Sequence, residues 1–97
     1  MSQIKFSWDE NKNEQNIRKH KISFAEAKSV FYDNFARIIH DPDHSEMEDR
    51  YLILGLSESL RILVVVHCYY KFSEEIRIIS ARIATKKEKL QYNELRK

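Results

Sequence analysis

The fold is decided by the stretch Glu75-Ile76-Arg77-Ile78-Ile79-Ser80-Ala81-Arg82-Ile83-Ala84-Thr85-Lys86-Lys87-Glu88, an apolar strand that carries two arginines and leads directly into a basic helix. Burying an arginine in a strand is costly unless an anionic or hydrogen-bonding group meets it. A small protein that works on phosphates needs such arginines, whereas a purely structural sheet does not. The stretch therefore predicts a function that involves phosphates.

The composition is that of one folded domain covering residues 1–97. Hydrophobic residues make up 42% and charged residues 33% of the chain, which argues against a disordered protein. The longest apolar run, residues 62–66, is far shorter than the ~18–20 residues of a membrane span, and the first residues lack the apolar stretch of a signal peptide. The single cysteine, Cys68, cannot form an internal disulfide, so we expect a reduced thiol and a cytoplasmic protein without a membrane partner.

Charge is distributed unevenly, although the net charge is only +2. Residues 33–49 contain six acidic side chains against one basic side chain, Arg37. Residues 75–97 contain seven basic and three acidic side chains. The basic part suits a polyanionic partner, and the alternative is that it is only a solvated helix.

Apolar spacing and capping residues predict secondary structure in the order β-α-α-β-β-β-β-α. Four consecutive strands joined by short turns most simply form an antiparallel sheet, to which an N-terminal strand is added. We expect the helices to cover one face of the sheet, which gives an α+β fold. The predicted elements are a strand over 4–8, a helix capped by Asp9 and closed by His20, a helix capped by Ser23 over about 24–31, strands over 35–40, 50–56, 60–70 and 76–84, and a C-terminal helix capped by Thr85.

Strand pairing decides which side chains share a face of this sheet. We expect Leu56 to pair with Leu60 in one hairpin and Tyr70 with Ile76 in the next, and a slip of one residue would exchange the faces. The expected pairing gathers Arg50, Ser80 and Arg82 on one face and His67, Tyr69 and Arg77 on the other.

Aromatic residues gather at the tip of the second hairpin, where Tyr69, Tyr70 and Phe72 lie close together in the sequence. Three aromatics are too many for a simple solvent-exposed loop. We therefore predict that they form a surface for a partner or for self-association.

Motifs along nearly the whole chain resemble those of the BrnT toxins of bacterial type II toxin–antitoxin pairs. They follow one another in the order that this family has. The motifs are Phe6-Ser7-Trp8-Asp9, Asn16-Ile17-Arg18-Lys19-His20, Ile22-Ser23-Phe24-Ala25-Glu26-Ala27, Asp41-Pro42-Asp43-His44-Ser45-Glu46, Glu48-Asp49-Arg50-Tyr51, Leu54-Gly55-Leu56-Ser57, Leu63-Val64-Val65-Val66-His67, Arg77-Ile78-Ile79-Ser80-Ala81-Arg82, Ala84-Thr85 and Tyr92.

This resemblance implies a RelE-like fold and a toxin that cleaves RNA and thereby inhibits translation. The implied partner is a BrnA-like antitoxin with a ribbon-helix-helix DNA-binding domain. The two proteins together would repress their own operon, so operator DNA would be contacted only through the antitoxin. A homodimer of the toxin within that complex is compatible with the resemblance.

The sequence departs from the family at several turns. Lys21 stands where a glycine usually follows Lys-His, and Met47 and the pair Tyr70-Lys71 also replace glycine. Cys68 replaces a common threonine. We expect the turns to adopt other geometries as a result.

Metal-free RNA cleavage needs a base for the 2′-hydroxyl, cations for the phosphorane and an acid for the leaving oxygen. Arg77 and Arg82 are the candidate cations; alternatively each pairs with an acid of the 41–49 loop. His67 is the first candidate for acid or base, or else a packed strand histidine. His20 and Tyr92 are further candidates, and each also has a structural interpretation, as a helix-end imidazolium and a helix packing residue.

Other basic residues are candidates for RNA binding rather than catalysis. Arg50 follows Glu48-Asp49, so its alternative role is to neutralise that pair. The remaining candidates are Lys12, Lys19, Lys86 and Lys87.

The segment His40-Asp41-Pro42-Asp43-His44 invites a metal-binding interpretation. Because Pro42 indicates a turn and no further ligand cluster accompanies it, we expect a solvated loop and no metal or cofactor. The alternative to a ribonuclease is a non-catalytic module that binds nucleic acid or acts as a co-repressor with the same basic surface.

Overall fold

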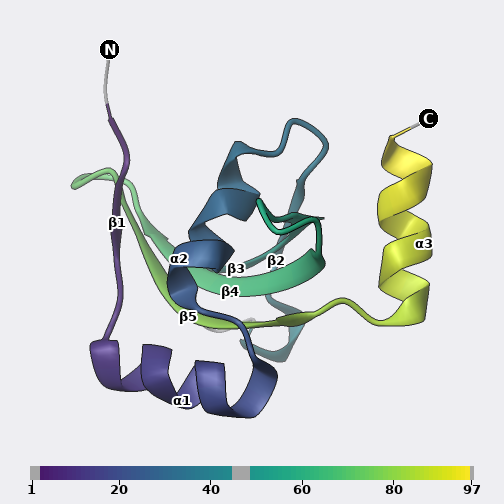
Figure 1. Cartoon of the computed structure of the whole chain (residues 1–97). Helices are drawn as coiled ribbons and strands as arrows, with labels where there is room; N and C mark the ends of the chain where they lie inside the picture. The colour runs from purple at the N-terminus through teal and green to yellow at the C-terminus, as the bar shows by residue number, and fades with distance from the viewer. Residues whose placement is uncertain (1–2, 45–48, 97) are drawn as a thin grey trace.

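The computed structural model describes residues 3–44 and 49–96, and in this part of the chain five strands form one mixed sheet in the order β1-β5-β4-β3-β2 (Figure 1). The four consecutive strands are antiparallel, and β1 is added parallel to β5. The predicted α+β fold and element order are confirmed, with the Val-rich β4 at the centre. The strands are β1 (Lys5–Ser7), β2 (Arg37–His40), β3 (Arg50–Leu56), β4 (Ile62–Tyr70) and β5 (Glu75–Ile83).

The helices begin where the capping residues predict. Asp9 accepts the backbone N–H groups of Asn11 and Lys12, Ser23 caps the second helix, and Thr85 forms a capping box with Glu88. No helix in the described residues is long and apolar enough to cross a membrane. The helical elements are α1 (Glu10–His20), α2 (Phe24–Ser29), the 3-10 turns η1 (Val30–Tyr32) and η2 (Pro42–His44), and α3 (Lys86–Leu95).

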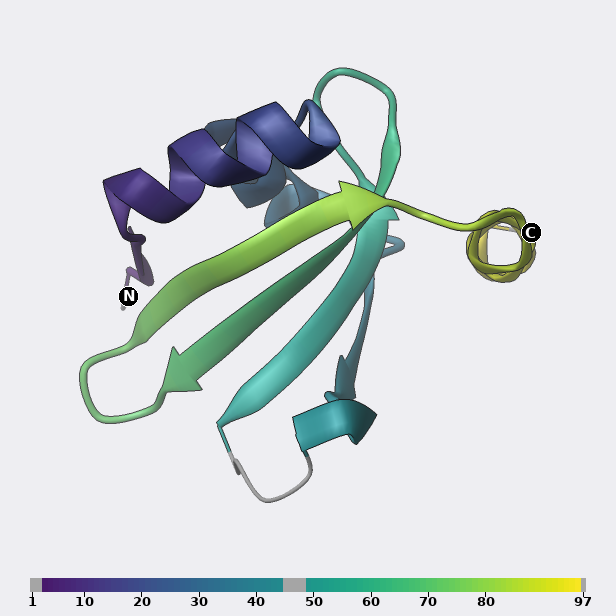
Figure 2. The same cartoon turned by 90° about the horizontal axis from the view of Figure 1, so that it is seen from below.

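One face of the sheet, which we call the helix face, is covered by α1 and α2 (Figure 2). The amide of Asn16 holds α1 to β5, since its nitrogen donates to the carbonyl of Ala81 and its oxygen accepts the N–H of the same residue. The core between the layers consists of Ile22, Phe24, Ala27, Val30, Ile53, Leu63, Val65, Ile78 and Ala81.

The C-terminal helix does not join this layer, so the expectation that all helices cover one face is wrong for α3. Figures 1 and 2 show α3 standing apart from α1 and α2, beyond the end of β5. Its residues Gln91 and Leu95 line a groove together with Leu54 and Val64, which point away from α1 and α2. The buried side chain of Tyr92 ties the helix to Asp33 near the end of η1.

The pairing in the first hairpin differs from the prediction. Leu56 pairs with Ile62 instead of Leu60, so Arg50 lies opposite Cys68. Leu60 adopts a left-handed backbone conformation in the loop, and Arg61 turns aside to bind Glu26 of α2. Local hydrogen bonds accompany this contact in the longer loop, since the N–H of Ser57 donates to the carbonyl of Arg61 and the N–H of Leu60 donates to the carbonyl of Ser57.

The pairing in the second hairpin changes at a β-bulge. Near the tip Tyr70 pairs with Glu75 rather than Ile76, yet Val66 pairs with Ser80 and Val64 with Arg82 as predicted. The two registers are reconciled because Ile79 has no partner on β4. The bulge reverses the faces of β5 on either side of it.

Two of the turns in which the family has glycine contain a residue with positive φ. Lys21 ends α1 with φ 61°, and its N–H donates to the carbonyl of Ile17. In the β4–β5 hairpin the left-handed residue is Glu74, with φ 52°, rather than Tyr70-Lys71. Met47 lies outside the described residues.

Candidate functional site

The side of the sheet opposite the helix face, which we call the arginine face, gathers most of the predicted cations. Residues paired across neighbouring strands point to the same side. Because of the bulge at Ile79, Arg77 pairs with Cys68, which pairs with Arg50. The predicted grouping of Arg77 with His67 is therefore wrong. Of the described arginines, the arginine face carries Arg37, Arg50, Arg77 and Arg82.

Arg77 is the arginine best placed to receive an anion. Its side chain is half-buried and makes no hydrogen bond or ion pair with any residue that the structure describes. Burial and the neighbouring Cys68 raise the pKa of Tyr70, whereas the charge of Arg77 acts in the opposite direction, which places Arg77 near this hydroxyl. A half-buried guanidinium without a partner is costly by itself, and an anion such as a phosphate would stabilise it.

Arg82 is already engaged by a carboxylate. Its two terminal nitrogens donate to the two oxygens of Glu88 at 2.8 and 3.0 Å. This hydrogen-bonded pair, against the opposing effect of burial, lowers the pKa of Glu88 to about 2. The expected alternative partner was the 41–49 loop, but the partner belongs to α3. The carboxylate occupies the same fork that a phosphate would use.

Arg50 is held by Asp41 of the acidic loop; of the predicted pair Glu48-Asp49, only Asp49 lies within the described residues. Its Nε donates to the buried carboxylate of Asp41 at 3.0 Å. Asp41 also accepts the N–H of Asp43, and Glu48 lies outside the described residues. Across residues 3–44 and 49–96, no group of three or more His, Cys, Asp and Glu side chains is arranged to hold a metal ion.

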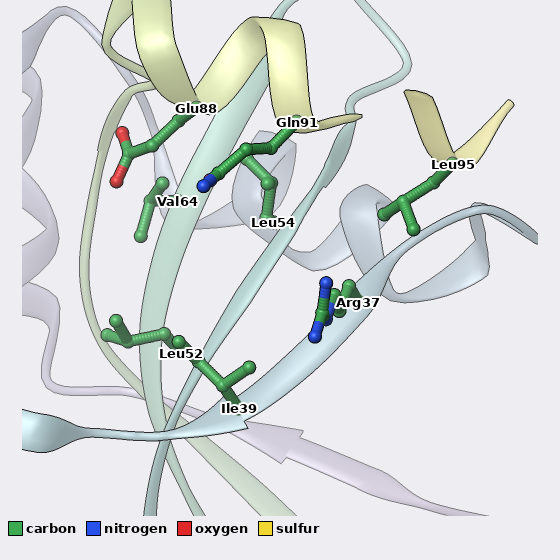
Figure 3. A pocket seen from close by; sticks show the side chains of 8 residues that line it. All are labelled: Arg37, Ile39, Leu52, Leu54, Val64, Glu88, Gln91 and Leu95. Carbon is green, nitrogen blue, oxygen red and sulfur yellow. The ribbon is translucent and has the colours of Figure 1, made fainter. Parts of the chain in front are cut away.

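A groove of about 240 Å³ runs between α3 and the arginine face (Figure 3). Leu52, Leu54 and Val64 supply apolar side chains from β3 and β4, while Arg37 of β2 and Glu88 of α3 supply charge. The arginine face thus combines cations with an apolar floor. Such a surface suits a ribose-phosphate chain with its bases.

His67 lies on the helix face, separated from the arginines by the sheet. Its side chain is 2% exposed, and Nδ1 donates to the carbonyl of Val65 at 3.3 Å. The edge of its ring faces Phe31, with 4.8 Å between ring centroids. Burial lowers the pKa of His67, so the imidazole is neutral at pH 7.

Tyr92 is completely buried, and its hydroxyl donates to Oδ2 of Asp33 at 2.6 Å. Burial and this bond raise the pKa of Tyr92 to about 12. The carboxylate of Asp33 also accepts the N–H groups of Leu56 and Phe35. Burial opposes it, but these bonds, the bond from Tyr92 and the charge of Arg96 together lower the pKa of Asp33. The hydrogen bond between Tyr92 and Asp33 therefore holds α3 against the rest of the fold.

The remaining candidates divide between the two sides of the molecule. Lys86 and Lys87 are exposed at the start of α3, close in sequence to Arg82. Lys12 and Lys19 are exposed on α1, and His20 is its last residue. Since α1 packs on the helix face, these three do not meet the arginines.

Sequence reasoning missed the roles of Glu88, Asp41 and Arg37. Glu88 completes the capping box of Thr85, which the sequence indicates, but nothing local indicates that it also binds Arg82. The alternation of Arg37 and Ile39 in β2 was the available signal for Arg37, since it places both on one face.

The fold and the arginine face define a small α+β protein with a surface suited to the phosphates of nucleic acid. A family model described as "Ribonuclease toxin, BrnT, of type II toxin-antitoxin system" matches residues 8–88, and the chain belongs to this family.

Among solved structures, the crystal structure of the Brucella abortus ribonuclease toxin BrnT is similar, with a TM-score of 0.67 and 28% sequence identity. The match covers 87% of this chain and 100% of that one. No curated protein matches the sequence significantly.

Proposed function

We propose that this protein is the toxin of a type II toxin–antitoxin pair and that it cleaves RNA on the arginine face without a metal ion. The observation that carries the proposal is the bulge at Ile79, which brings Arg77 to the face that also holds Arg50 and Arg82. The family description as a ribonuclease toxin supports the reaction. Lys86 and Lys87, exposed at the start of α3, would supply further RNA contacts.

The reaction that fits this surface is attack by the ribose 2′-oxygen on the adjacent phosphorus. The proton of the 2′-hydroxyl passes to solvent water, the bond from phosphorus to the 5′-oxygen breaks, and the 5′-oxygen takes a proton from water, which leaves a 2′,3′-cyclic phosphate and a 5′-hydroxyl. The pentavalent transition state carries extra negative charge, and Arg77 and Arg82 would stabilise it. His67 and His20 lie on the helix side of the sheet and Tyr92 is buried against Asp33, so the proposal gives them no part in proton transfer.

The partner in this proposal is a BrnA-like ribbon-helix-helix antitoxin. It neutralises the toxin, and the complex represses its own operon through the DNA-binding domain of the antitoxin. Membership in a type II toxin–antitoxin family supports an antitoxin partner. Co-expression of a small ribbon-helix-helix protein encoded beside this chain should restore growth.

Induction in a bacterial host tests the toxin function. The wild type should stop growth and degrade RNA, whereas Arg77→Ala and Arg82→Ala, at matched soluble expression, should do neither. Arg18→Ala is the matched control, because Arg18 is an exposed arginine on α1, away from the arginine face. Harmless wild-type protein that leaves RNA intact would contradict the proposal.

The occupied state of Arg82 favours a second candidate, a module that binds nucleic acid without cutting it. Glu88 fills the guanidinium fork in the protein as it stands. Under this alternative, growth arrest and RNA degradation are both absent, while the antitoxin complex still requires the protein for tight operator binding.

A further inference from the structure

A cavity of about 260 Å³ opens on the helix face where α1 and α2 leave the sheet uncovered. It is on the opposite side of the sheet from the arginines. Its walls are apolar or aromatic, and no Lys, Arg, Asp or Glu lines it among the described residues. The lining residues are Ile4, Ile38, Tyr51, His67, Tyr69 and Ile76.

His67 presents a hydrogen-bond acceptor to this cavity. Because a carbonyl can only accept, Nδ1 must carry the hydrogen in its contact with Val65, and Nε2 is left with a lone pair. Nε2 makes no hydrogen bond to any described residue. In the described part of the chain, every side-chain nitrogen or oxygen that is fully enclosed has a hydrogen-bond partner. Nε2 is therefore not enclosed, and it opens into the cavity that His67 lines.

Aromatic rings fix the imidazole in this position. Phe31 meets it edge-on, and Tyr51 lies roughly parallel to it, with an interplanar angle of 28° and 6.0 Å between centroids. Burial keeps the ring neutral by lowering the pKa of His67. A neutral, oriented acceptor in an apolar site selects a ligand that brings one N–H or O–H donor on an otherwise apolar body.

The apolar residues around the cavity indicate that the ligand with this donor belongs to a protein segment. Ile4, Ile38 and Ile76 continue into an adjoining groove with Phe6, Phe31 and Tyr32. Among the described residues no Lys or Arg lines that groove, although the ammonium of Lys28 lies 5.2 Å from the centroid of the Phe6 ring. Ile4 is 50% and Ile38 56% exposed, so the apolar strip extends beyond the cavity. An RNA strand laid here would bring phosphates that no lining cation meets.

The edge of the sheet beside the cavity can also pair with an extended chain. Asp41 donates its N–H to the carbonyl of Arg50, which makes this a hydrogen-bonded pair of the β2–β3 ladder. Such pairs alternate along an antiparallel ladder, so the N–H and C=O of Ile38 point outward from the edge. An added strand would find both groups next to the cavity.

We propose that this cavity binds an aromatic side chain with a donor, tryptophan or tyrosine, from an extended segment of another protein that pairs with β2. The inference goes beyond the proposed function and does not depend on RNA cleavage. The earlier prediction of one surface from Tyr69, Tyr70 and Phe72 changes accordingly. Tyr69 lines the cavity, whereas Tyr70 lies on the arginine face and Phe72 is fully exposed at the hairpin tip.

The test is an NMR titration of the full chain with indole and, separately, with 1-methylindole, which lacks the donor. Indole should bind saturably, shift the signals of Ile38, His67 and Ile76, and bind about fivefold more tightly than 1-methylindole. Saturable binding of cytosine or adenine in preference to indole would overturn the assignment to a protein side chain. Absence of saturable indole binding to folded protein would overturn the site.

Variants distinguish the contribution of the His67 acceptor to indole binding from that of the apolar cavity. His67→Phe should bind indole and 1-methylindole equally well. Ile38→Glu, at an exposed position, should abolish indole binding in a folded protein, and Ile39→Glu is its matched control on the other face of β2. Equal indole binding by His67→Phe, Ile38→Glu and Ile39→Glu would refute the proposal.

The outcome is independent of the ribonuclease proposal. Ile38→Glu should leave RNA cleavage unchanged, and Arg77→Ala should leave indole binding unchanged. Failure of one proposal is thereby distinguished from failure of the other.

Discussion

Replacing Tyr92 with phenylalanine separates a structural role from a catalytic one. The ring of Tyr92 is completely buried, and its hydroxyl makes a 2.6 Å hydrogen bond to Asp33. Tyr92→Phe keeps the ring, including its contact with the guanidinium of Arg96, and removes only this bond. The change therefore measures how strongly α3 is tied to the rest of the fold.

The magnitude follows from the charged acceptor. A hydrogen bond to a charged group contributes about 1.5–3 kcal/mol. Asp33 retains the N–H groups of Leu56 and Phe35, so its carboxylate is not left without donors. We therefore expect a loss near the middle of that range, about 2 kcal/mol, which corresponds to a decrease in Tm of about 8–16 °C for a domain of this size.

Urea denaturation followed by circular dichroism measures this loss. The midpoint should fall while the dependence of the unfolding free energy on urea stays the same. Tyr32→Phe is the control, because Tyr32 is 70% exposed and its hydroxyl bonds to no described residue. Tyr92→Phe should still cleave RNA at a temperature where it is folded. Unchanged stability, or a stable variant without cleavage, would refute the structural role.

Three further changes test other parts of the structure. Lys21 has φ 61°, so Lys21→Gly should raise the urea-derived unfolding free energy by about 0.5–1 kcal/mol, and a decrease would contradict the assigned strain. Burial lowers the pKa of His67 below 6.5, so the unfolded chain binds the proton first and stability should fall from pH 6.5 to 5, by at most about 1.4 kcal/mol per pH unit. His67→Phe should remove most of that slope, and an equal slope would assign it to other groups. Glu88→Gln keeps a side chain that can cap the helix but removes the charge that holds Arg82, so RNA affinity in a fluorescence assay should rise about threefold to tenfold. The control Glu14→Gln on α1 should leave RNA affinity unchanged. Unchanged affinity of Glu88→Gln would show that Glu88 does not compete with RNA.

The helix starts and the order of elements could be predicted because their causes are local. Asp9, Ser23 and Thr85 each accept backbone N–H groups two or three residues further on. The apolar periodicity of the strands likewise depends on neighbouring residues. These features do not require knowledge of what packs where.

The faces of the strands could not be predicted because they depend on distant contacts. Arg61, at the end of the first hairpin loop, binds Glu26 across 35 positions of sequence, a contact that no local pattern indicates. The bulge at Ile79 then reverses the side on which Arg77 lies. The sequence indicates that the arginines matter, but only the pairing shows which of them share a surface.

The roles of single site residues could not be predicted for the same reason, because they depend on contacts with residues far away in the sequence. The hydroxyl of Tyr92 finds its acceptor 59 positions away, at Asp33. Glu88 serves both the capping box and Arg82, and only the first role has a local signature. His67 was predicted as an acid or base next to Arg77, but the sheet separates it from that arginine.

The most direct test of the central claim is cleavage of single-stranded RNA by purified protein in the presence of a metal chelator. Wild type and Arg18→Ala should yield products with 2′,3′-cyclic phosphate and 5′-hydroxyl ends, and Arg77→Ala should be slower by about 100-fold. Intact RNA with the wild type, or cleavage by Arg77→Ala at the wild-type rate, would contradict the account.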